Sequence, residues 1–291
     1  MRSVFQVSGL GMLGVLMLEG CAADSCLVCD PPEHSGNVEN VDLFELSGIA
    51  ASFKFADVIY THNDSGDSSR FFALTSAGMN LATYIVDNAM NDDWEDIARA
   101  PCASGECLYI GDIGDNDLER TSYTIYLVGE PATIEPGTHT LPSDKVEFSY
   151  PDGSVNAEVL LVHPTTGAVT IITKVESGPA SIYELGALRL DQPVQAKKVG
   201  ELEPPEGSAR FTGGSIHPDA TGILLRTNGR LFHYPMKPGQ TAAAALDAEP
   251  CLLELADEAQ GEAVTWLRGG AGIMTIGESS AAPINIAQCN G

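Results

Sequence analysis

Short apolar runs separated by Gly, Pro, Asn and Asp recur along the chain from residue 38 onward. Runs of this kind, bounded by turn-forming residues, are typical of β-strands. Helical periodicity is absent apart from one turn at residues 242–246. The pattern therefore predicts an all-β domain, which can be a sandwich, a barrel or a propeller. The expected strands cover residues 49–50, 58–60, 71–74, 81–86, 108–110, 124–128, 159–162, 169–173, 182–185, 223–225, 230–234, 263–267 and 273–276.

A glutamate at the entry of a short apolar strand recurs along the chain and distinguishes among these folds. The motifs stand 50 to 63 residues apart, a second strand follows each, and one of them has Thr in place of Glu. The entry residues are Glu45, Glu95, Glu158, Thr212 and Glu262. Units of this size with four strands each are typical of propeller blades. We predict a five-bladed β-propeller, with six blades as the alternative because a weak repeat is easily missed.

The fifth unit is too short for a complete blade, since only about 30 residues follow Glu262. Residues 37–44, just before the first unit, are expected to supply the missing outer strand. Strands from both termini would then close the ring and remove its open edge. Residues 37–291 are accordingly expected to form a single propeller domain.

The N-terminus carries a targeting pattern. Arg2 precedes an apolar run, and Leu18-Glu19-Gly20-Cys21 follows it, which resembles a bacterial lipobox. We expect a lipoprotein signal peptide over residues 1–20, diacylation of Cys21 and a polar tether over residues 21–36. Ala22 favours the outer membrane of a bacterial envelope by the same resemblance, and an ordinary secreted protein is the alternative. No later apolar run is long enough to span a bilayer.

The charge is strongly negative, with 15 Lys and Arg against 40 Asp and Glu and a formal net charge of −25. This excludes nucleic acid as an expected partner, because binding to phosphate backbones needs clustered cations. A solvated acidic surface and a cation-binding protein both fit such a charge.

The cysteine count agrees with export. Six cysteines remain after Cys21, and an even number in an oxidising compartment indicates disulfides. Cys102 and Cys107 flank a short loop and are the expected pair. Cys26 and Cys29 are expected to form a bridge within the tether or to Cys251 or Cys289; the sequence leaves the connectivity open.

The blade geometry predicts a shared site at the axis. In a propeller blade the first strand lies innermost and the second runs back beside it. The start of the first strand and the end of the second therefore share one face near the axis. Carboxylate and amide oxygens without thiolates select a hard cation, which we expect to be Ca²⁺. The expected metal ligands are Glu45, Asn63, Glu95, Asp112, Asn116, Glu158 and Glu262.

A ligand is expected beside the metal. Lys174 and Arg226 can neutralise part of the glutamate ring or hold an anionic group. The expected ligand-binding residues are Asp64, Lys174, Thr212, Arg226 and Glu278. The alternative is structural: a glutamate at each inner strand can bond backbone amides between blades and hold the ring together. EF-hand loops, Gly-x-Ser-x-Gly elbows and phosphate-binding Gly-Lys-Ser/Thr loops do not occur in the sequence.

Several sequence segments recur in a known group of proteins. They include Glu45-x-Ser-Gly-Ile-Ala, Thr61-His-Asn-Asp-Ser-Gly-Asp, Asp93-Trp-Glu-Asp-Ile-Ala, Gly111-Asp-Ile-Gly-Asp-Asn, Asn156-Ala-Glu-x-Leu-Leu-Val and Gln260-Gly-Glu-Ala. With these segments the chain resembles a group of uncharacterised bacterial secreted propellers over nearly all of residues 39–288. That group is distantly similar to esterase-like phytase propellers and to gluconolactonase and Tol-type propellers. Gluconolactonases hold a central divalent metal with Glu, Asn and Asp, and the resemblance implies comparable roles for some of Glu45, Asn63, Glu95, Asp112, Asn116 and Glu158.

Three functional hypotheses follow. The first is a lipid-anchored propeller that binds Ca²⁺ and an unknown small molecule or envelope protein at its acidic face, without catalysis. The second is a metal-dependent hydrolase of phosphoesters or lactones, which would use a metal-activated water. The third is a structural envelope protein with no metal. Propellers host binders, hydrolases and scaffolds alike, so the fold does not choose among them.

Overall fold

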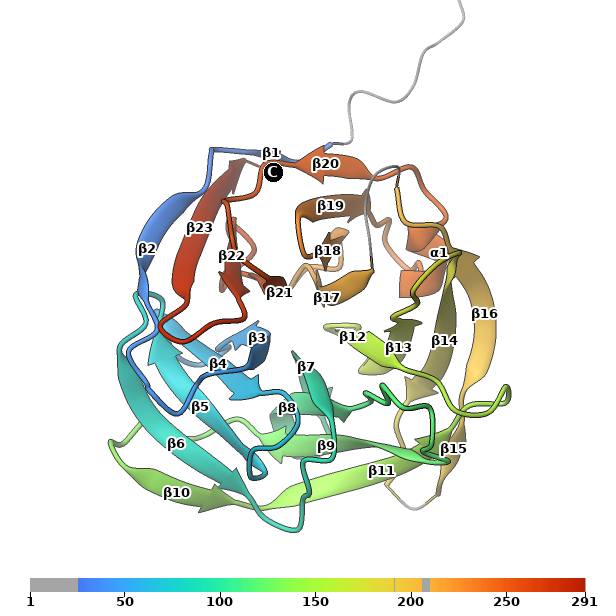
Figure 1. The fold of residues 1–291 in the computed structure, drawn as a ribbon, viewed down its shortest axis with the longest axis horizontal. Coiled ribbons are helices and arrows are strands. Elements are labelled where there is room, and N and C mark those ends of the chain that lie inside the picture. Colours follow the sequence, from blue (N-terminus) through green and yellow to red (C-terminus); the bar gives the residue numbers. More distant parts are fainter. Residues whose placement is uncertain (1–25, 191, 206–209, 291) are drawn as a thin grey trace, which may run out of the picture.

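The strands form five sheets arranged in a ring around a central axis (Figure 1). This computed structural model describes residues 26–190, 192–205 and 210–290. Within these residues α1 (Ala242–Leu246) is the single helix, at the position where the sequence predicts a helical turn. The protein is therefore a five-bladed β-propeller, as expected, and the six-bladed alternative is excluded.

Each blade is an antiparallel sheet whose first strand lies nearest the axis. Blade 1 contains β3 (Leu46–Ala51), β4 (Val58–Asn63), β5 (Arg70–Thr75) and β6 (Asn80–Val86). Blade 2 contains β7 (Trp94–Cys102), β8 (Gly105–Asp112), β9 (Tyr123–Gly129) and β11 (Ser143–Ser149). Blade 3 contains β12 (Ala157–Val162), β13 (Ala168–Thr173), β14 (Ala180–Ala187) and β16 (Lys197–Leu202). Blade 4 contains β17 (Phe211–Ile216), β18 (Gly222–Thr227), β19 (Arg230–Pro235) and β20 (Cys251–Leu253). Blade 5 contains β21 (Gly261–Trp266), β22 (Gly272–Gly277) and β23 (Pro283–Asn290).

Two short strands join neighbouring blades at the outer edge. β10 (Thr138–Leu141) leaves the connection before β11 and pairs in parallel with β6 of blade 1. β15 (Val194–Gln195) leaves the connection before β16 and pairs in parallel with β11 of blade 2. These additions cover sheet edges that would otherwise present unpaired backbone groups.

The N-terminal segment closes the ring, but not where the sequence analysis placed it. β2 (Glu33–Asn37) and β1 (Val28–Cys29) pair antiparallel with β23 and complete blade 5. The expected outer strand at residues 37–44 is wrong, because residues 38–45 form an irregular connection to β3. The expected polar tether is likewise too long, since from β1 onward its residues belong to the blade. The pairing with β23 determines which residues form the closing strands, and the short polar run in this segment does not reveal that pairing in the sequence.

Two of the three disulfides reinforce this closure. Cys26 is bonded to Cys251 at the start of β20, and Cys29 is bonded to Cys289 in β23. The third joins Cys102 and Cys107 across the hairpin between β7 and β8, which confirms the expected pair. Three disulfides are consistent with an extracytoplasmic location.

The targeting features lie outside the described residues, which begin at Cys26. They are the expected signal peptide over residues 1–20, the expected diacylation site Cys21 and the first residues of the expected tether. Among the residues that the structure covers, none belongs to a helix long and apolar enough to cross a membrane.

The core consists of apolar wedges between neighbouring blades. Tyr123, Tyr150 and Tyr183 stack edge to face between blades 2 and 3, with ring centroids 4.9 and 4.7 Å apart. Similar buried clusters fill the other four interfaces around the ring. Each inner strand therefore contacts two neighbours and is held firmly, which gives the axis a rigid frame.

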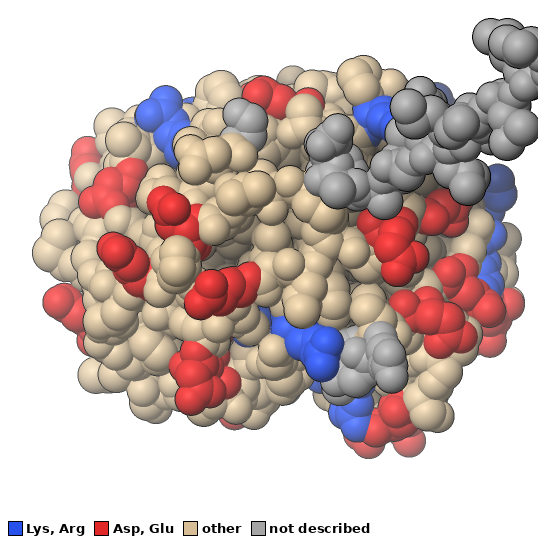
Figure 2. Space-filling view, turned by 90° about the horizontal axis from the view of Figure 1, so that it is seen from above, with Lys and Arg blue, Asp and Glu red and all other residues tan. Residues whose placement is uncertain are grey.

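The surface is acidic, as the composition predicts. Figure 2 shows the outer side of the ring, where Asp and Glu side chains are scattered among fewer Lys and Arg. Many of the carboxylates are thus solvated and need no further explanation. The buried carboxylates near the axis are the exception.

Candidate metal centre

A β-bulge at the entry of each inner strand controls which side chain faces the axis. The register between first and second strand shifts at one place in every blade. In blades 2 to 5 the residue skipped by the ladder is the motif residue itself: Glu95, Glu158, Thr212 and Glu262. A bulge re-aims the side chain that it carries, and these bulges explain why charged residues stand at the entry of buried strands.

Blade 1 departs from the expected alignment. Leu46 pairs with Asn63 as Trp94 pairs with Asp112, so Ser47 and not Glu45 occupies the position of Glu95. The Ser47 hydroxyl donates to the carbonyl oxygen of Glu95 at 2.5 Å. Glu45 precedes β3 and corresponds to Asp93. The expected alignment of Glu45 with the strand-entry residues of the other blades is therefore wrong by two positions of register.

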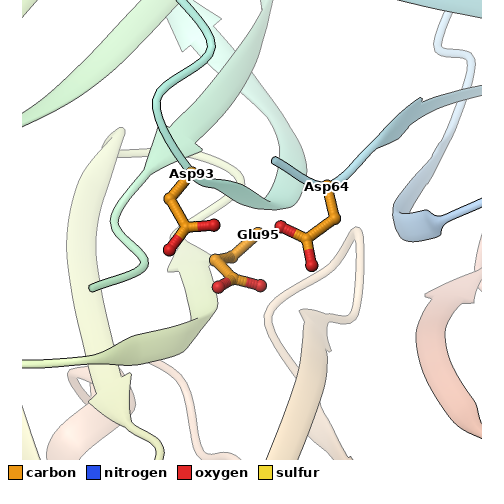
Figure 3. A group of neighbouring side chains, drawn as sticks. All are labelled: Asp64, Asp93 and Glu95. Atoms are coloured by element: carbon orange, nitrogen blue, oxygen red, sulfur yellow. The ribbon is translucent and has the colours of Figure 1, made fainter. Parts of the chain in front are cut away.

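Three carboxylates converge beside the axis. Asp93 immediately precedes β7, Glu95 lies on its bulge, and Asp64 follows the end of β4 in the neighbouring blade. One carboxylate oxygen of each lies within 4.8 Å of the others. Figure 3 shows the three side chains pointing toward one another from two adjacent blades. Such a group can hold a metal ion.

Two of these carboxylates are buried and incompletely paired. Glu95 is 2% exposed and Asp93 is 9% exposed. Glu95 Oε1 and Asp93 Oδ1 are buried without a hydrogen-bond donor among the described residues. A buried polar atom without a partner costs free energy, and an unpaired charge costs far more. The burial of these two oxygens is therefore not compensated by a hydrogen-bond donor among the described residues.

Gly114 makes the convergence possible. A Cβ atom built on Gly114 would clash with Glu95 Oε1 and with Asp93 Oδ2. The Gly114 amide also donates to the Asp93 carbonyl oxygen at 3.1 Å, which holds the two backbone segments together. Only a residue without a side chain leaves this space for the two carboxylates.

The pKa values of the clustered carboxylates are also shifted upward. Burial, followed by repulsion from Asp64, raises the pKa of Asp93 to about 7. The same two causes raise the pKa of Glu95 well above its ordinary value. Without a cation, like charges this close favour protonated carboxyls. A bound cation would instead stabilise the ionised forms.

Lys174 lies among the other acidic side chains near the axis, which are Glu158, Glu262 and Glu278. Lys174 pairs with Glu158, whose second oxygen is buried without a partner among the described residues. Glu262 accepts a hydrogen bond from Gln260 at 3.1 Å, and burial raises the pKa of Glu262 to about 7. Glu278 also bonds Gln260. Lys174 is close enough to lower the pKa of Glu95 and of Glu262, so it lies within this ring of acidic side chains.

Of the seven expected metal ligands only Glu95 belongs to the cluster, and three of the others, Asn63, Asp112 and Asn116, have partners elsewhere. Asn63 holds the preceding loop by accepting from the Phe44 and Glu45 amides at 3.1 and 3.3 Å. Asp112 accepts from the Asp93 amide at 3.1 Å and pairs with Arg120 at 2.8 Å, so it positions Asp93. Asn116 accepts from Asn156 at 3.1 Å.

Two of the expected ligand-binding residues have structural partners instead. The Thr212 hydroxyl donates to the Gly261 carbonyl oxygen at 2.8 Å and joins blades 4 and 5. Arg226 is entirely buried and pairs with Glu258 at 2.9 Å. Its guanidinium also donates to the Ala263 carbonyl oxygen at 2.8 Å. Arg226 is therefore committed to the blade interface and not available to a ligand.

Asp96 fulfils the structural role that the sequence analysis assigned to the glutamates. It is 2% exposed and accepts from the Ile97 and Leu160 amides at 2.9 Å each. It thereby ties blade 2 to blade 3.

Two residues of the carboxylate cluster were not among the expected metal ligands. Asp93 was not expected to bind either a metal or a ligand, and Asp64 was expected to contact the ligand and not the metal. The run of acidic residues at 92–96 was the available signal, but periodicity alone did not show which of them face the axis.

No protein-family model matches this chain, and no curated protein matches it. The function of this chain is therefore inferred from the geometry of its axial site.

Proposed function

We propose that this protein is an extracytoplasmic β-propeller that binds Ca²⁺ at Asp64, Asp93 and Glu95, and that the bound ion helps to hold a ligand. The observation that carries the proposal is the pair of buried oxygens, Glu95 Oε1 and Asp93 Oδ1, which lack donors inside a convergent carboxylate cluster. A divalent cation would supply the missing partner for both.

The donor set favours calcium. All three side chains offer oxygen, which suits a hard cation and not a thiophilic metal. Ca²⁺ takes about six to eight oxygen ligands, and three carboxylates supply at most six of them. Water or a ligand oxygen can complete the coordination. Mg²⁺ demands a stricter octahedral geometry, so a cluster drawn from two blades and a loop suits it less well.

The proposed location is the bacterial cell envelope, with the outer membrane favoured, where lipid on Cys21 would anchor the protein. The lipobox-like sequence Leu18-Glu19-Gly20-Cys21 supports the anchor. Three disulfides support an oxidising compartment. The resemblance to secreted bacterial propellers and, distantly, to gluconolactonases supports both the compartment and a divalent metal.

The experiment is a calcium titration of chelator-washed protein by calorimetry, together with thermal unfolding. We expect one ion per chain, and stabilisation of about 2.7 kcal/mol when free Ca²⁺ is 100-fold above its Kd. Glu95→Gln and Gly114→Ala should each weaken binding by about tenfold or more, since one removes a charge and the other fills its space.

Glu147→Gln is the matched control. Glu147 is exposed on β11 and pairs with Lys145 at 2.9 Å, far from the axis in the blade order. Its substitution should leave calcium affinity unchanged. Absence of calcium binding to the wild-type protein, or equal affinity in Glu95→Gln, would refute the assignment.

A metal-dependent hydrolase is the second candidate, because the three carboxylates leave coordination positions for a water molecule. Phosphomonoesters and lactones should be assayed with the calcium-loaded wild type and with Glu95→Gln. Turnover that disappears in Glu95→Gln would establish the hydrolase; calcium binding without turnover of these substrates would favour the binder.

A further inference from the structure

A cavity of about 360 Å³ lies on the same face as the acidic cluster, over blades 2 and 3. Its walls come from the loop after β8, the segment before β12, the end of β13 and the residue before β17. These strand ends lie on the face of the ring that carries Asp64, Asp93 and Glu95. The cavity is within the size range of small-molecule sites.

The charge of this cavity differs from that of the protein as a whole. Lys174 and Arg210 line it, and Glu176 is the one acidic residue among its lining residues. On a chain with a net charge of −25, this lining is unusual because its cations outnumber its carboxylates, although Glu158, the partner of Lys174, lies next to it. Arginine and lysine together are suited to an anionic group such as a carboxylate or a phosphate.

The Arg210 guanidinium can turn toward a ligand at small cost. Arg210 pairs with Glu176, but their side chains are 39% and 79% exposed. An exposed ion pair contributes little to stability, so an incoming anion can replace Glu176. The Lys174 ammonium pairs with Glu158 and lines the cavity as well, and an ammonium can donate up to three hydrogen bonds.

One wall is apolar and held in a strained conformation. Leu118 is 56% exposed and has φ of 54°, which is rare for a leucine. The Asp115 carboxylate accepts from the Glu119 and Arg120 amides at 2.9 and 3.0 Å and fixes this loop. Strained residues that the surroundings hold in place are common at ligand sites. Val155 and Val175 continue the apolar surface.

We propose that this cavity binds a small organic anion, a carboxylate or a phosphate monoester. Its anionic group lies between Lys174 and Arg210, and its apolar part lies against Leu118 and Val175. The inference does not depend on calcium, because both cations belong to the chain. Since Lys174 faces both the cavity and the acidic ring, a bound ion at the ring would strengthen the binding of the anion.

The test is calorimetric titration of the purified protein with phenyl phosphate, benzoate and benzyl alcohol, first after chelation and then with Ca²⁺. We expect at least one of the two anions to bind and the neutral alcohol not to bind. Arg210→Gln and Lys174→Gln should each raise the Kd by about tenfold, the effect of losing one charge-assisted contact. Lys198→Gln, which removes an exposed lysine paired with Glu201 on β16, should leave the Kd unchanged.

Each outcome decides the proposal. Binding of phenyl phosphate alone or of benzoate alone supports it and identifies the anionic group. Anion binding without calcium binding supports the cavity and refutes the metal proposal. Failure of both anions to bind, binding of the alcohol equal to that of the anions, or no change in Kd in Arg210→Gln overturns the proposal. Circular dichroism and thermal unfolding verify that the variants are folded.

Discussion

At the scale of single residues, the acidic cluster depends on a one-residue irregularity in a β-ladder. Glu95 is skipped by the register between β7 and β8, and this bulge turns its side chain toward Asp64 and Asp93. Gly114 leaves the space that the carboxylates occupy. The sequence pattern singled out Glu95, which lies in this cluster, because the strand entry is visible as a polar residue before an apolar run. It did not identify Asp93 as a ligand, because adjacent acidic residues differ only in the direction of their side chains.

The metal-free protein should lose stability as pH rises. The pKa values of Asp93 and Glu262 are raised to about 7 from ordinary values of 3.8 and 4.5. The folded state therefore holds protons that the unfolded state releases, and stability falls as pH rises from about 4 through about 7. The melting temperature after chelation should decline over this range, and Ca²⁺ should restore it at the upper end.

The control for this prediction is an Asp93→Asn/Glu262→Gln variant, which has no carboxyl to titrate at either position. Its decline with pH should be smaller than that of the wild type. A decline of the same size in both proteins would show that other groups cause the pH dependence.

At the scale of elements, buried polar side chains join neighbouring blades. Arg226 on β18 reaches across to Glu258 and to the Ala263 carbonyl oxygen in blade 5. Glu258 in turn accepts from Thr275 at 2.6 Å and from Asn285 at 2.8 Å. The sequence placed Arg226 at the axis because it lies near a strand end. The register shows that Thr227 pairs with Phe211, so Asn228 and not Arg226 corresponds to Lys174.

Substitution of Arg226 should therefore destabilise the fold without affecting a ligand. Arg226→Met leaves Glu258 buried without its charge partner, and we expect the free energy of unfolding to fall by about 3 to 5 kcal/mol. Calcium affinity should not change in the folded variant. Denaturant unfolding and calcium titration measure the two quantities.

Arg230→Met, on the partly exposed start of β19, is the matched control and should cost much less. If Arg226→Met instead weakens calcium or anion binding and leaves stability unchanged, the structural role assigned to Arg226 is wrong.

At the scale of the whole molecule, the ring is closed by strands from both termini and fastened by two long-range disulfides. These bonds join residues 225 and 260 positions apart, whereas Cys102–Cys107 joins residues 5 apart. A disulfide that closes a long loop restricts the unfolded chain more than one that closes a short loop.

The Cys29→Ala/Cys289→Ala variant should accordingly lower the free energy of unfolding by about 2 to 4 kcal/mol. Cys102→Ala/Cys107→Ala should have a smaller effect, which denaturant unfolding of both variants would measure. A larger loss in the hairpin variant would contradict the view that ring closure dominates.

The sequence by itself determined the fold class, the number of blades and the pairing of Cys102 with Cys107. These features depend on local periodicity and on neighbours close in sequence, which are visible in a single chain. The tertiary structure decided which carboxylates meet, because Asp64 comes from one blade and Asp93 and Glu95 from the next. It also decided the closing strands and the other two disulfides, which join the ends of the chain. A shift of one or two residues in register changes which side chain faces the axis, and only pairing between strands sets that register.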